Sequence, residues 1–177
     1  MNSDWDILES ARKGDEVSWR KIVEGHNPHL VKIAFLITGS IETANDLTQE
    51  TFIKIFRKKE KHHDGSLKAY LSKILYHLAL KEKKRFGKFI ELDSEAEAVN
   101  PSSLDEIIGE EKDRFLALAI NSLDARQRET LVLRFYGGHS YDEIAKITDV
   151  PIGTVKSRIF NAVNNCRKDL RKKGILE

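Results

Sequence analysis

The sequence predicts an all-α protein: two small helical domains joined by a flexible acidic linker, the C-terminal one containing a helix-turn-helix. The 177 residues include only 10 Gly and 3 Pro, too few for the many tight turns of a β-sandwich or barrel. Apolar residues recur at helical spacing through long Lys-, Glu- and Leu-rich stretches. This periodicity is lost over residues 87–103, which are rich in Ser and acidic residues. We therefore expect domains at 1–86 and 104–177, with the linker at 87–103.

The N-terminal half reads as a series of helices. Short apolar-periodic segments at 15–24 and 29–37 are predicted to be separate helices, because Pro28 interrupts the pattern. Gly39 is expected to end the second of them. Further helices are expected over 42–59 and 66–85, with Ser66 as the N-cap of the latter.

Two capping boxes mark helix starts in the C-terminal half. Ser103 to Glu106 is expected to open a helix that ends near residue 122, and Ser140 to Glu143 a short helix that ends near residue 148. A helix over 124–136 lies between them and stops at a Gly-Gly pair. The last helix is predicted from Pro151 to about residue 172, since Pro suits a first helical turn.

The last two helices have the spacing of a helix-turn-helix. At 100° per residue, one face of the final helix is apolar and must be buried: Val155, Ile159, Ala162, Val163, Cys166 and Leu170. The opposite face is basic and amide-rich around one aromatic ring: Lys156, Ser157, Phe160, Asn161, Asn164, Arg167 and Lys168. Such side chains can contact thymine methyls, adenine edges, guanine or phosphate in a major groove. Asp149 occupies the turn where Gly is common, but Asp tolerates left-handed dihedral angles better than most residues.

The segment 66–85 carries a second basic pattern. Beside its apolar stripe run two aromatic and three basic side chains at helical spacing: Tyr70, Lys73, His77, Lys81 and Lys84. Stacking rings interleaved with cations are typical of proteins that bind single-stranded nucleic acid. A solvated Lys face with half-buried Tyr and His explains the same pattern, and both interpretations stay open.

The segment 42–59 presents two contrasting faces. Ala44, Thr48, Thr51 and Ile55 are expected to face the core, whereas Asp46, Gln49, Glu50, Ile53 and Arg57 point away from it. A single exposed Ile needs no explanation. Its position within a ring of polar residues is nevertheless compatible with a surface that docks on a partner protein.

Charge is distributed unevenly, although the formal net charge is only +2. Residues 54–86 hold 11 basic and 3 acidic side chains, and residues 156–173 hold 7 and 1, which favours a polyanionic partner. Residues 87–115 hold 3 basic and 9 acidic side chains, a net charge of −6. This acidic segment either folds back over a basic face or keeps the tether solvated and extended.

Four segments, in this order, resemble the bacterial extracytoplasmic-function (ECF) sigma factors. GDEVSWRKIVEGHNPHLVKIAFLITG (14–39) fits the helices that open the family, and TANDLTQETFIKIFRK (43–58) resembles its polymerase-binding helix. GSLKAYLSKILYHLALKEKKR (65–85) resembles the promoter-melting helix. LDARQRETLVLRFYGGHSYDEIAKITDVPIGTVKSRIFNAVNNCRKDL (123–170) is similar to the C-terminal DNA-binding domain. The resemblance implies an RNA polymerase sigma factor that recognises −10 and −35 promoter elements and directs transcription initiation.

The resemblance also implies a role for each surface. Docking on the clamp of the largest subunit of core RNA polymerase would fall to Asp46, Leu47, Gln49, Glu50 and Ile53. Capture of the −10 element, with a flipped base held before Ser66, would fall to His62, His63, Ser66, Tyr70, Lys73, His77, Lys81 and Lys84. Duplex −35 DNA would be read by Thr154, Lys156, Ser157, Arg158, Phe160 and Asn161. Tyr70, His77 and Lys81 depart from the commonest family residues. An anti-sigma factor is a further expected partner, and the free chain is expected to be a monomer.

Other classes of protein fit less well. No metal is expected, because His62-His63-Asp64 and the pair His26/His29 lack a third ligand at a recognisable helical spacing. No catalytic residue or cofactor is expected either, because the sequence has no Gly-rich phosphate loop, nucleophile elbow or matched carboxylate pair. The chain is therefore not expected to be an enzyme. A single cysteine and the absence of a membrane-length apolar run predict a cytoplasmic protein without membrane insertion. The alternative is a helix-turn-helix transcriptional regulator that binds DNA without acting as a polymerase subunit.

Overall fold

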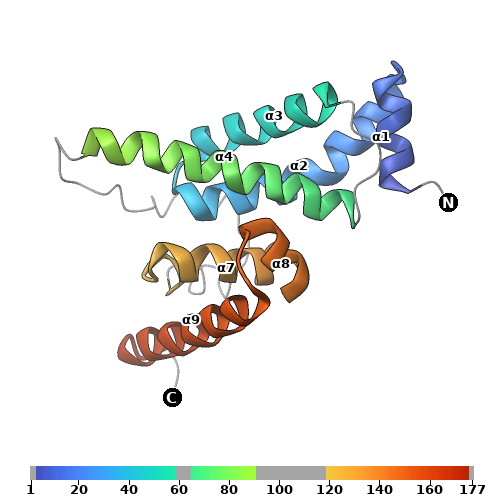
Figure 1. Cartoon of the computed structure of the whole chain (residues 1–177). Coiled ribbons are helices and arrows are strands. Elements are labelled where there is room, and N and C mark those ends of the chain that lie inside the picture. The colour runs from blue at the N-terminus through green and yellow to red at the C-terminus, as the bar shows by residue number, and fades with distance from the viewer. Residues whose placement is uncertain (1–2, 59–64, 91–118, 176–177) are drawn as a thin grey trace.

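The computed structural model describes residues 3–58, 65–90 and 119–175, and every element longer than one turn in these ranges is an α-helix (Figure 1). The predicted all-α class is therefore confirmed. The helices are α1 (Asp4–Arg12), α2 (Glu16–Thr38), α3 (Ile41–Arg57), α4 (Leu67–Ile90), α7 (Ala125–Phe135), α8 (Tyr141–Thr148) and α9 (Ile152–Lys172). No helix in these ranges has both the length and the apolar character needed to cross a membrane.

Helix α1 was not predicted from the sequence. Ser3 and Asp6 form a capping box, in which the Ser3 backbone N–H donates to Asp6 Oδ2 over 2.8 Å. Trp5, Leu8 and Ala11 recur at spacings of three and bury one face of the helix. Both signals are present in the sequence, so α1 could have been predicted.

The predicted break at Pro28 is wrong, because α2 runs through it without interruption. Proline removes one backbone N–H, which leaves the carbonyl oxygen four residues earlier without its helical donor. Pro28 and Glu24 are both exposed, so water can solvate that carbonyl. Burial of Ile22, Leu30 and Ile33 on the opposite face keeps the two halves in one helix.

Helix α4 is longer than predicted and reaches Ile90, so the first residues of the expected linker 87–103 are helical. The remainder of that linker and residues 103–118 of the helix expected from Ser103 lie outside the described residues, whereas residues 119–121, near its predicted end, are helical. The division into two domains therefore stays a prediction.

The C-terminal helices match their predicted starts. Asp124 caps α7, and Ser140 and Glu143 form the expected capping box of α8. Between them the chain needs a glycine, because a Cβ on Gly137 would lie 2.4 Å from the Leu133 carbonyl oxygen. Asp149 adopts the left-handed conformation with φ 53° and ψ 43°, so the turn before α9 is kept without glycine.

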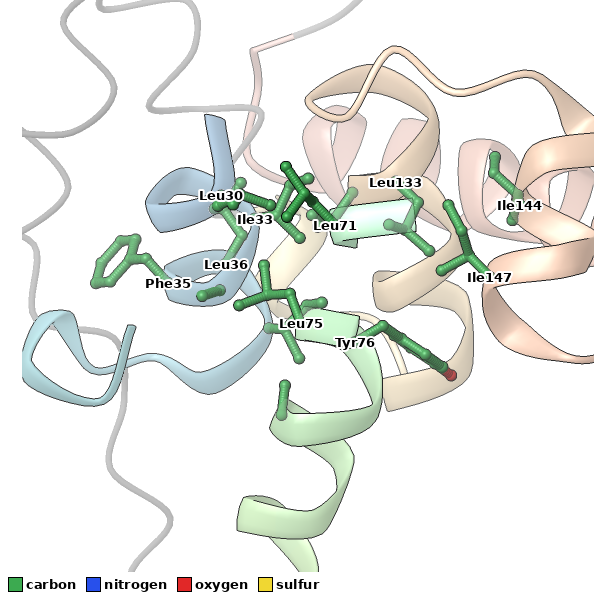
Figure 2. Packing of buried hydrophobic residues seen from close by; sticks show 14 of the residues in the cluster. Leu30, Ile33, Phe35, Leu36, Leu71, Leu75, Tyr76, Leu133, Ile144 and Ile147 are labelled. Atoms are coloured by element: carbon green, nitrogen blue, oxygen red, sulfur yellow. The ribbon is translucent and has the colours of Figure 1, made fainter. Parts of the chain in front are cut away.

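One continuous apolar core connects the N-terminal and C-terminal helices. Helix α4 contacts α2 and α3 as well as α8, and α2 also contacts α7 (Figure 1). Figure 2 shows Leu71 of α4 between Leu30 and Ile33 of α2 on one side and Leu133 of α7 on the other. Helix α4 is thus buried on more than the single stripe that its sequence predicts.

Candidate nucleic-acid interface

Helix α9 presents the predicted basic face to solvent. Val155, Ile159, Ala162 and Cys166 are buried against the rest of the helix-turn-helix, which orients the opposite face outward. The Phe160 side chain is 68% exposed, far more than a structural role requires. Lys156, Ser157 and Asn161 are also exposed, while Thr154 and Arg158 are half-buried. The arrangement offers one aromatic ring surrounded by hydrogen-bond donors and a cation, side chains that can contact thymine methyls and base edges in a major groove.

The second predicted surface lies on α4, and we call it the α4 stripe: Tyr70, Lys73, His77, Lys81 and Lys84. Tyr70 and Lys73 are half-buried, whereas His77, Lys81 and Lys84 are exposed. Lys73 forms an ion pair with Asp149 of the turn between α8 and α9, and His77 Nε2 lies 3.1 Å from the same carboxylate. The predicted −10 residues His62 and His63 lie outside the described residues.

The N-terminal end of the α4 stripe is held in place by α1. Trp5 donates its indole N–H to the Gly65 carbonyl over 2.9 Å, and its ring lies 5.6 Å from that of Tyr70. The Ser66 hydroxyl accepts from the backbone N–H of Ala69 over 3.1 Å and so caps α4. A pocket of about 540 Å³ opens at this end of α4, lined by Lys58, Gly65, Ser66, Ala69, Tyr70, Lys73, Glu143, Lys146 and Ile147.

The predicted partner-docking face lies on α3. Asp46, Gln49 and Glu50 are exposed, and Ile53 is 41% exposed among them. Leu47 was assigned to the same face by resemblance, but it is buried, because it lies three residues after Ala44 and four before Thr51 on the core side. Its side chain therefore packs in the core, apart from the other four.

Several buried polar groups between α4 and the C-terminal helices were missed by the sequence reasoning. Glu129 is only 4% exposed and accepts from the Tyr76 hydroxyl over 3.1 Å and from Lys83 Nζ over 3.2 Å. His139 Nε2 lies 2.9 Å from the Ser72 hydroxyl. Nothing in the sequence marks these residues, because they are buried only when α4 packs against α7 and α8.

Burial shifts the pKa values of these groups. The pKa of His139 is lowered to about 4, mainly because burial removes its solvation; the Glu143 carboxylate opposes this shift and the Lys68 ammonium adds to it. The pKa of His29, whose ring centroid lies 5.8 Å from that of His139, is also lowered to about 4, mainly by burial. Burial and the Glu129 carboxylate raise the pKa of Tyr76. Both histidines are therefore neutral near pH 7.

Within the described ranges, no group of three or more His, Cys, Asp or Glu side chains is placed to hold a metal ion. His26, one of the four histidines weighed as ligands, lies 3.3 Å from the Asp4 carboxylate. Cys166 is buried, and burial raises the pKa of its thiol.

Two family models match the chain at the surfaces described above. Sigma-70 region 2 matches residues 22–88, which include α3 and the α4 stripe. Sigma-70 region 4 matches residues 116–166, which include α7, α8 and most of α9. A regulator that shares only the helix-turn-helix is not favoured by the first of these matches.

Curated relatives extend over both regions. The ECF RNA polymerase sigma factor SigE of Mycolicibacterium smegmatis is 32% identical over 165 residues, which cover 88% of this chain and 62% of that protein. The ECF RNA polymerase sigma-E factor of Escherichia coli is 31% identical over 173 residues, 88% of each chain.

Solved structures share the fold. The sigma factor RpoE of Bartonella quintana, in complex with the anti-sigma factor NepR, aligns with a TM-score of 0.72 and 28% identity over 86% of this chain and 96% of its own. CnrH, in complex with the cytosolic domain of CnrY, aligns with a TM-score of 0.72 at 20% identity over 97% and 99% of the two chains, a likeness of fold alone. With both sigma-70 regions matched in order and sigma-E relatives aligned over most of their length, the chain belongs to the ECF RNA polymerase sigma factors.

Proposed function

We propose that this chain binds core RNA polymerase through α3, captures the −10 element on the α4 stripe and reads the −35 element as duplex on α9. The observation that carries the proposal is the exposed Phe160 among Lys156, Ser157 and Asn161 on a capped helix-turn-helix. The solvent-exposed ring of Phe160 on this helix is best explained by binding in the major groove of DNA, which would cover it. Thr154 and Arg158, half-buried at the edge of this face, would contact phosphates or position their neighbours.

The α4 stripe suits an opened strand better than a duplex. Tyr70 provides a stacking ring beside the pocket at the start of α4, and Lys73, Lys81 and Lys84 would follow the backbone phosphates. Ser66 and the pocket next to it would hold an unstacked base.

The exposed α3 residues Asp46, Gln49, Glu50 and Ile53 would dock on the clamp of the largest polymerase subunit. We further propose that an anti-sigma factor regulates the chain, because the related sigma factor RpoE of Bartonella quintana forms a complex with the anti-sigma factor NepR. The chain would act in the cytoplasm, where polymerase and promoter are, and would direct initiation without catalysing a reaction itself.

The test is reconstitution with purified core RNA polymerase. A sigma factor should co-elute with core polymerase on gel filtration. It should also yield transcripts from a template library with randomised −35 and −10 segments, and the productive templates should share a sequence. Binding to DNA without co-elution and without transcripts would instead indicate the helix-turn-helix regulator.

Replacing Tyr70 by Ala is expected to weaken capture of the opened strand. Loss of one stacked base corresponds to roughly 1–3 kcal/mol, or about 5- to 150-fold in affinity. Tyr70→Phe is the matched control, because it keeps the ring and removes only the hydroxyl that accepts from Lys58 Nζ. The measurement is binding of a single-stranded −10 oligonucleotide, of sequence taken from the productive templates, to the reconstituted holoenzyme. Equal affinities of the Ala and Phe variants would show that the ring does not stack on DNA.

A further inference from the structure

Helix α1 contacts the chain on both sides of residues 59–64, which lie outside the described residues. Before them, Arg12 Nη2 donates to the Ile55 carbonyl in the last turn of α3 over 2.7 Å. After them, the Trp5 indole N–H donates to the Gly65 carbonyl over 2.9 Å. One short helix therefore holds both the end of α3 and the approach to α4. Sigma-70 region 2 matches residues 22–88, so that match assigns α1 no role.

The Gly65 carbonyl takes its hydrogen bond from outside its own helix. It precedes the N-cap Ser66, so it is not an acceptor in the hydrogen-bond ladder of α4. Gly65 has φ 113°, a backbone conformation that residues with a Cβ rarely adopt. Because a glycine backbone has many accessible conformations, the bond from Trp5 restricts this peptide to one orientation.

Trp5 also contacts Tyr70, the stacking ring of the α4 stripe. The two ring centroids lie 5.6 Å apart, with the ring planes tilted by 50°. The Tyr70 hydroxyl in turn accepts from Lys58 Nζ over 3.1 Å. Gly65 and Tyr70 both line the pocket at the start of α4, whereas the buried Trp5 supports them without lining it. One indole thus contacts two parts of the pocket wall.

We propose that Trp5 is a positioning residue for −10 recognition: its indole orients the Gly65 peptide and the Tyr70 ring, so that the pocket has its base-binding shape before the opened strand arrives. The inference rests on the proposed capture of the −10 strand at the α4 stripe. Binding groups that are already held in place lose less conformational entropy on binding. Loss of the indole should therefore weaken the contribution of the captured base. It should leave the phosphate contacts of Lys81 and Lys84, further along α4, unchanged.

The test removes the indole N–H and keeps an aromatic ring. Trp5→Phe does this beside Tyr70. Its matched control is Trp19→Phe, because Trp19 of α2 packs against Phe52 and Phe56 of α3 instead. The probe is the fluorescent single-stranded −10 oligonucleotide with the sequence of the productive templates, together with a series in which one base at a time is replaced by an abasic site. Each probe is titrated with holoenzyme reconstituted from core polymerase.

The quantity of interest is the abasic penalty, the loss of affinity when one base is removed. In the wild-type holoenzyme, removal of the captured base should weaken binding by about 5- to 150-fold, the range for one stacked base. In Trp5→Phe this penalty should be roughly fivefold smaller, as expected for the loss of one hydrogen bond. The abasic oligonucleotide itself should bind both proteins equally, and Trp19→Phe should keep the wild-type penalty.

A second variant changes the orientation of the same peptide and leaves Trp5 intact. A Cβ on Gly65 would meet no atom within 4 Å, so Gly65→Ala is strained only by its φ of 113°. The peptide must reorient to relieve that strain, and the abasic penalty should again be smaller than in the wild type.

Two results would overturn the inference. One is a wild-type abasic penalty in either Trp5→Phe or Gly65→Ala. The other is equal weakening of intact and abasic oligonucleotides by Trp5→Phe, which is what a merely structural role of Trp5 would cause. Failure of the proposed −10 capture is distinguishable, because the wild-type holoenzyme would then show no abasic penalty at any position, and the inference would fail with it.

Discussion

Replacing Gln49 by Ala and Ile53 by Glu together is expected to abolish binding to core RNA polymerase without unfolding the chain. Both side chains point away from the core of their own helix, and Ile53 is 41% exposed. In a docked complex, a carboxylate at position 53 would be buried without a partner. Losing a central contact of this kind costs at least about 2 kcal/mol, or roughly 30-fold in affinity. Affinity is measured by titrating labelled chain with core polymerase.

The chain offers a matched control for the added charge. Val17, near the start of α2, is an aliphatic side chain that is 64% exposed, so Val17→Glu introduces the same carboxylate on another exposed surface. This variant should bind polymerase as the wild type does, and both variants should keep the helical circular dichroism of the wild type. If the Gln49/Ile53 variant bound core RNA polymerase with wild-type affinity, α3 would not be the docking surface.

Acidification from pH 7 to about pH 4.5 is expected to destabilise the chain strongly. Burial lowers the pKa of His139 from 6.5 to about 4. Between these pH values the unfolded chain binds a proton at His139 and the folded chain does not, so acidification favours unfolding. Because one pKa unit is about 1.4 kcal/mol, His139 alone corresponds to roughly 3 kcal/mol. His29 of α2 has the same shift, but its proximity to His139 means that the two contributions are shared.

The sign and the pH window follow from the direction of each shift. For a base with a lowered folded-state pKa, the stabilisation is complete above about pH 6.5 and is lost as the pH falls toward 4. The carboxylates that face this region behave differently. The pKa of Glu143 is lowered from 4.5 and that of Asp149 from 3.8, so their stabilisation is lost only below those values. As the pH falls, the loss of stability due to the histidines therefore begins before the loss due to the carboxylates.

The measurement is the midpoint of thermal unfolding between pH 7 and 4.5. The glutamine of His139→Gln cannot titrate and can still hydrogen-bond to Ser72. The unfolding midpoint of this variant should therefore depend less on pH than that of the wild type. The midpoint of the double variant His29→Gln/His139→Gln should depend on pH still less. Parallel profiles for the wild type and both variants would mean that these histidines do not titrate with unfolding.

Local sequence signals predicted most of the helices well. Ser66 and Ser140 cap their helices as predicted, and Asp124, the predicted first residue of its helix, is the cap of α7. A cap depends only on residues within one turn, so the sequence reveals it. The exposed faces of α3 and α9 follow from the 3.6-residue period in the same way. The predicted helix break at Pro28 was wrong. The low helix propensity of proline is a local effect, and it is outweighed by burial of the opposite face of α2 in the tertiary structure.

The sequence by itself determined the all-α class, the capped helix-turn-helix, and the faces of α3, α4 and α9 that carry the candidate surfaces. Each depends on residues within a few turns of one another. Only the tertiary structure decided that α4 is buried on a second side, that His139 and Glu129 lie inside, and that Asp149 meets Lys73 and His77. These contacts join residues more than 50 positions apart. They exist because α4 packs between two sets of helices, and no local periodicity encodes which of its faces receives the second set.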